Sequence, residues 1–136
     1  MAPIIKIIAL SNVYTRMMHF LNKGDVEEGH KHTYDHATLV SSGSVQLDIL
    51  DDFKNVVDTN TFRAPTMIYI KKENNHRITA LEDNTVCGCI HAVRTIDEEI
   101  VDPEFLITPA VWDNGGRVNK LVERKYNKKM LPLDIA

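Results

Sequence analysis

The stretch from Gly24 to Gly43, GDVEEGHKHTYDHATLVSSG, decides how the rest of this chain is interpreted. It places three histidines, His30, His32 and His36, within seven residues. Alternate side chains of an extended strand point to the same face, so His30 and His32 would project together. His36 can return to the same point if the chain bends before it. Three converging imidazoles are typical of a metal site, whereas a surface histidine cluster needs no fixed spacing.

The spacing of this stretch resembles the first signature motif of the cupin superfamily. That motif has a glycine, five residues, His-x-His, three residues, a further ligand, six residues and a second glycine. Gly24 and Gly43 occupy the glycine positions. One position departs from the family pattern, because His36 stands where the motif usually carries a glutamate. The resemblance extends over residues 7–93.

A second family motif supplies one more histidine, near the start of a later strand. His76, in KKENNHRITAL, corresponds to it, although Lys71, Glu73 and Ala80 replace the proline, glycine and asparagine usual around it. The resemblance implies one divalent transition metal, held jointly by four histidines: His30, His32, His36 and His76. Neutral imidazoles bind Fe, Mn, Ni, Zn and Cu, so the ligands leave the metal's identity open.

The segment before residue 94 reads as eight or nine short strands at close spacing, which favours an all-β antiparallel sandwich or barrel. The second strand of a hairpin is predicted at Lys54–Asp58, and a further strand over Thr61–Ile70. The resemblance sharpens the fold to a double-stranded β-helix, a jelly-roll barrel spanning residues 1–93. Residues 94–136 are predicted to form a C-terminal extension packed on the barrel. It is expected to include a short amphipathic helix over Arg117–Lys129, whose basic residues form a solvated face.

Composition limits the function further. The 136 residues are 43% hydrophobic and 26% charged, with a net charge of −3, so we expect one domain and no nucleic-acid partner. No segment has the length of a membrane span or the pattern of a signal peptide. Cys87 and Cys89 are expected to be reduced thiols in a cytoplasmic protein. The apolar strand Pro3–Leu10 lacks an obvious hairpin partner, which predicts a homodimer that covers a sheet edge.

Four neutral ligands leave the ion with nearly its full positive charge, which favours an anionic substrate. The expected protein is therefore a metal-dependent enzyme acting on a small anionic organic compound, and a dioxygenase is the favoured reaction. A non-redox lyase or isomerase is an alternative, and a non-catalytic ligand-binding cupin is another.

Other side chains are candidates around the metal. Tyr34, inside the histidine motif, is the candidate catalytic proton donor or base. Cys87, Cys89 and His91 share one face of the last strand and would line the pocket if that face points inward. The opposite face is the more apolar, which favours the outward orientation. Arg77 is either a candidate partner for an anionic substrate or itself a solvated charge on the surface.

Overall fold

The computed structural model describes residues 1–10, 12–29, 31, 33–93 and 99. Over these residues the chain forms strands and no helix. The strands are β1 (Ile4–Leu10), β2 (Val13–Phe20), β3 (Val26–Glu28), β4 (His36–Ser42), β5 (Ser44–Leu50), β6 (Val56–Arg63), β7 (Thr66–Ile70), β8 (Asn75–Ala80) and β9 (Thr85–Ala92). None of the described residues belongs to a helix that could cross a membrane.

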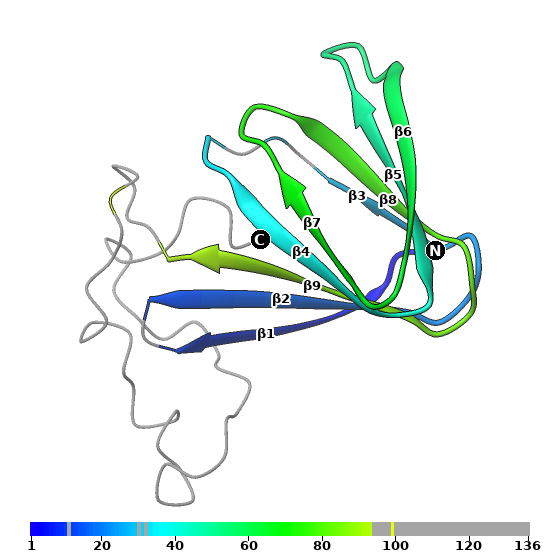
Figure 1. Ribbon diagram of the computed structural model, residues 1–136, viewed down its shortest axis with the longest axis horizontal. Coiled ribbons are helices and arrows are strands. Elements are labelled where there is room, and N and C mark those ends of the chain that lie inside the picture. The colour runs from blue at the N-terminus through cyan, green and yellow to red at the C-terminus, as the bar shows by residue number, and fades with distance from the viewer. Residues whose placement is uncertain (11, 30, 32, 94–98, 100–136) are drawn as a thin grey trace, which may run out of the picture. The chain divides into compact units, whose positions relative to one another are not determined.

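The strands form two sheets, with orders β1-β2-β9-β4-β7 and β3-β8-β5-β6. The chain changes sheet at every connection except β1–β2 and the β5–β6 hairpin (Figure 1). Strand β8 pairs antiparallel with both β3 and β5, β5 with β6, and β4 with β7. A chain that alternates between two antiparallel sheets in this way is a double-stranded β-helix, so the expected all-β fold is confirmed.

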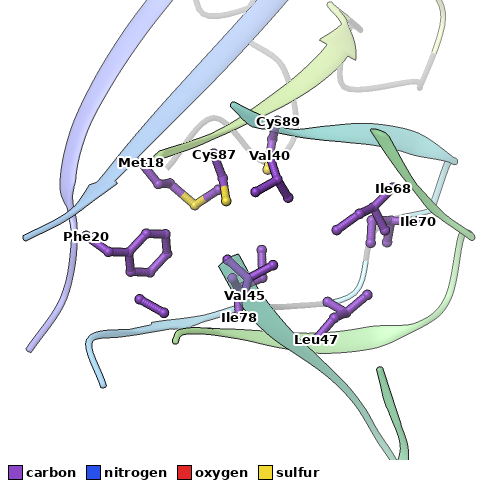
Figure 2. Packing of buried hydrophobic residues seen from close by; sticks show 11 residues of the cluster. Met18, Phe20, Val40, Val45, Leu47, Ile68, Ile70, Ile78, Cys87 and Cys89 are labelled. Atoms are coloured by element: carbon purple, nitrogen blue, oxygen red, sulfur yellow. The ribbon is translucent and has the colours of Figure 1, made fainter. Parts of the chain in front are cut away.

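The core lies between the inner faces of the two sheets. In Figure 2, Val40 of β4, Ile68 of β7 and Cys87 of β9 face Val45 of β5 and Ile78 of β8. Burying one large apolar side chain contributes roughly 1.5–3 kcal/mol. A one-residue slip of any strand would turn its apolar face outward, so this packing sets the register that positions the site.

Gly43 is the turn between β4 and β5, where the chain passes from one sheet to the other. Its φ of +76° lies in the left-handed region that side chains rarely adopt. A Cβ added there would also collide with the side chain of Thr85. The last glycine of the histidine motif is therefore required by backbone conformation and by space.

The sequence-based boundaries of the strands around Pro65 are wrong. One strand, β6, continues from Val56 to Arg63, and β7 begins at Thr66 in the other sheet. The Ala64–Pro65 peptide between them is cis. Proline has no N–H to donate to a strand ladder, so the chain leaves the first sheet at this residue instead of running through it.

The chain divides into two compact units, which are Met1–Ile5 with Met17–Cys89, and Lys6–Arg16 with Ile90–Ala136. The first contains the core described above. In the second, Val93 N–H donates to the Asn12 carbonyl (2.8 Å), and the Tyr14 and His91 rings are 5.5 Å apart at their centroids. The predicted helix over 117–129 lies outside the described residues, as does the C-terminal extension except Glu99.

Candidate metal centre

His36 is the first residue of β4, and its side chain points into the interior. Alternation along the strand buries His36, Thr38 and Val40 on one face. The cross-strand neighbour of His36 on β7 is Ile70, so an apolar side chain lies beside the imidazole. The preceding loop is anchored by Asp35, whose carboxylate accepts a hydrogen bond from the Lys72 backbone N–H at 2.7 Å.

His76 occupies the matching position on the other sheet. It is the second residue of β8, buried, and its cross-strand neighbour on β5 is Ile49. Its Nδ1 lies 3.3 Å from the carbonyl oxygen of Asn74. A carbonyl oxygen only accepts, so Nδ1 carries the proton and Nε2 has the lone pair. A backbone carbonyl that orients a histidine in this way is the usual support of a metal ligand.

The two imidazoles approach each other across the interior. Their ring centroids are 5.6 Å apart, and the rings are tilted by 46°. Two imidazoles on one tetrahedral ion, with metal–nitrogen bonds of about 2.0–2.1 Å, have centroids roughly 5 Å apart. The observed centroid distance is therefore close to that of two rings bound to one ion.

Gly29 is a site residue that the motif pattern did not reveal. It follows β3 and lies against His76, because a Cβ at this position would collide with the His76 carbonyl oxygen and approach its ring Cδ2 to 3.0 Å. Only a residue without a side chain lets the chain pass this close to β8. The next residue in the sequence is His30, the first histidine of the motif. The signal in sequence is simply a glycine directly before the first motif histidine.

The inner face of β9 differs from the sequence-based preference. Cys87, Cys89 and His91 are buried, whereas Val86 and Ile90 on the other face are only partly covered. The outward orientation is therefore wrong. Buried cysteine packs as a small apolar residue. The face that carries Cys87 and Cys89 is therefore more apolar than the sequence-based comparison assumed. Burial, followed by the charge of Cys89, raises the pKa of the Cys87 thiol to about 12.

One group among the described residues satisfies the spacing of a metal site. Within it, His36 of β4 and Cys89 of β9 have potential ligand atoms that lie within 4.8 Å of one another. These two side chains thus offer an imidazole and a thiol to one ion. Whether Cys87, Cys89 and His91 line a pocket stays a prediction.

The structure says less about three other predicted site residues. His30 and His32 lie outside the described residues. Tyr34 lies in the bend between them and β4 and is partly exposed; its catalytic role stays a prediction.

Arg77 is on the outer face of β8, away from His76. Its guanidinium Nη2 donates to the buried Asp48 carboxylate at 2.9 Å. The Thr59 hydroxyl and Gln46 amide donate to the same carboxylate. Burial opposes ionisation, but these hydrogen bonds outweigh it and lower the pKa of Asp48. Arg77 therefore supports the sheet.

Comparison with known proteins establishes the fold. KdgF from a Halomonas species matches with a TM-score of 0.55 and 18% identity over 68% of this chain and 82% of its own. A cupin family protein of Methanocaldococcus jannaschii with a double-stranded β-helix fold matches with a TM-score of 0.54 and 11% identity over 66% of this chain and 79% of its own. A variant of Bacillus subtilis oxalate decarboxylase matches with a TM-score of 0.50 and 21% identity, over 60% of this chain but 21% of its own.

No protein-family model matches the chain, and no curated protein matches its sequence. At these identities the solved structures show the fold alone.

Proposed function

We propose, from the premise that this chain has the double-stranded β-helix fold of the cupins, that it is a metal-dependent enzyme acting on a small anionic organic compound. The observation that carries the proposal is the approach of two buried histidines from opposite sheets, with ring centroids 5.6 Å apart. Each ring has an isoleucine as its cross-strand neighbour. Imidazole nitrogens are ligands of divalent transition ions, so two rings that approach from opposite sheets can share one ion.

The residues fit a divalent transition metal. His36 and His76 would hold it from opposite sheets, and the motif places His30 and His32 as the other ligands. When bound, such an ion supplies Lewis acidity toward a carboxylate or carbonyl oxygen and, where it is redox-active, electrons for dioxygen chemistry. The Asn74 carbonyl accepts a hydrogen bond from Nδ1 of His76, so Nε2 is the nitrogen that would bind the metal.

The substrate class follows from charge. Imidazole ligands are neutral, so an ion held by histidines alone attracts an anion such as a carboxylate, enolate or catecholate into its remaining positions. We propose dioxygenation of such a compound as the reaction, with Tyr34 as the group that moves a proton. The name of one structural neighbour, oxalate decarboxylase, supports a second candidate, a non-oxygenating reaction on a small carboxylate.

Oxygen uptake separates these reactions. The full chain would be reconstituted separately with Fe²⁺, Mn²⁺ and Zn²⁺, and each sample supplied with a panel of small carboxylates and catechols. Dioxygenation predicts oxygen consumption that requires the protein, a redox-active ion and one class of compound. Substrate loss without oxygen uptake would support the non-oxygenating reaction. Binding without turnover under every condition would contradict both and leave a ligand-binding protein.

A further inference from the structure

A thiol lies beside the proposed metal ligands. The sulfur of Cys89 and a ring nitrogen of His36 belong to the group whose donor atoms are all within 4.8 Å of one another. Both side chains are buried, with exposed fractions of 6% and 5%. Cys89 is not a ligand position of the motif that identified His36.

A buried hydrogen bond positions this sulfur. Thr38 is two residues after His36 on β4, so both side chains project from the same face. The Thr38 hydroxyl lies 3.4 Å from Cys89 Sγ, and Thr38 is completely buried. The contact places the thiol of β9 beside the inner face of β4.

We propose that Cys89 supplies a thiolate ligand to the ion held by His36. The proposal rests on the proposed metal-binding function, because the ion is the same one. On binding, the S–H bond breaks, the proton passes to solvent, and the sulfur forms a bond to the metal without electron transfer. A thiolate and an imidazole nitrogen on one tetrahedral ion lie roughly 3.5 Å apart, which is within the spacing of the group.

A thiolate changes the chemistry of the site in two ways. It is a soft ligand, so it favours Zn, Fe, Co or Cu over Mg, Ca or Mn. It also carries a negative charge, so an ion and its neutral histidines fall from a net charge of about +2 to about +1. The attraction for an anionic substrate is then weaker than histidines alone would produce.

Cys87 provides the matched control. It lies two residues before Cys89 on the same buried face of β9, but it does not belong to the group that contains His36 and Cys89. Cys87→Ser therefore removes a neighbouring thiol without removing the proposed ligand. Cys89→Ser retains a small hydroxyl beside Thr38, and Cys89→Ala serves as a second variant without it.

The test is a Co²⁺ titration of the full chain, followed by absorption spectroscopy. Ligand-field bands report that cobalt is bound, and a thiolate-to-cobalt charge-transfer band reports a sulfur ligand. We expect both in the wild type and in Cys87→Ser. Both Cys89 variants should keep the ligand-field bands and lose the charge-transfer band. Their Co²⁺ affinity should fall by at least about tenfold, since even changes outside the ligand shell cost about 10–100-fold.

Each contrary result has a distinct meaning. Cobalt bound by the wild type without a charge-transfer band would overturn the thiolate ligand and leave the proposed metal site intact. A band that persists in the Cys89 variants would overturn the assignment of that cysteine. A band that persists at unchanged affinity in His36→Ala would show that sulfur and His36 do not share an ion. Failure of the wild type to bind cobalt would refute the proposed metal site as well.

Discussion

Replacing Gly29 with alanine tests whether the close approach of Gly29 to His76 positions this proposed metal ligand. The added methyl would collide with the His76 carbonyl oxygen and lie 3.0 Å from its ring Cδ2. Carbon contacts are favourable at about 3.5–4.0 Å, so the chain at Gly29 or at His76 must move by about 1 Å. His76 is also paired with Ile49 of β5, which restricts movement on its side.

The expected cost has two parts. Overpacking of a well-packed interior destabilises a protein by about 1–3 kcal/mol, and we expect Gly29→Ala to fall in this range. The displacement at His76 would also misplace a proposed metal ligand. Disturbing the groups that position a metal ligand weakens binding by about 10–100-fold, which is the loss of Zn²⁺ affinity we expect.

Gly24→Ala is the matched control. Gly24 has a φ of +92°, but a Cβ there would meet no atom within 4 Å. Alanine should therefore cost about 1–2 kcal/mol in backbone strain and leave the metal site in place. Denaturant unfolding of the metal-free chains measures stability, and competition with a chelator measures Zn²⁺ affinity. Equal Zn²⁺ affinities for the two variants would refute the positioning role of Gly29.

Three further changes test other parts of the account. Asp48→Asn should remove stability that the wild type has above about pH 4 and loses as the pH falls. Folding lowers the pKa of Asp48, so on acidification the unfolded chain takes up this proton before the folded chain does. Parallel acid-unfolding curves of the wild type and the variant would contradict this. His36→Glu should preserve metal binding while lowering the charge of the site by one, so azide affinity measured with the metal verified in both proteins should fall; equal affinities would mean that His36 is not a ligand. The homodimer predicted from the apolar first strand, which lies at the edge of its sheet, should appear in light scattering at high micromolar concentration, and a monomer there would exclude it.

Much of the fold could be predicted because local patterns and tertiary packing agree. Val45 and Leu47 alternate with polar residues on β5 and are buried in the core as period-two alternation predicts. His36, the last histidine of the predicted motif, is the first residue of β4, and its side chain is buried. The position of His76 opposite it came from the family resemblance, since nothing in spacing alone brings two strands of different sheets together.

The remaining errors come from information that is not local. The crossing at Pro65 depends on which sheet the next strand joins, whereas a hydrophobic run shows only that a strand exists. The orientation of β9 depends on burial of Cys87 and Cys89, which pack as small apolar side chains. Gly29 matters because of an atom of His76, forty-seven residues later in the chain. Such a contact leaves no periodic signal.

Anomalous diffraction from crystals of the full chain loaded with Zn²⁺ tests the central claim most directly. Data collected on both sides of the zinc absorption edge locate the ion independently of any assumed ligand. We predict one strong peak between β4 and β8, about 2.0–2.1 Å from a ring nitrogen of His36 and from Nε2 of His76. A peak bound elsewhere, with these two rings uncoordinated, or no peak in a crystal that contains zinc in its solvent, would contradict the account.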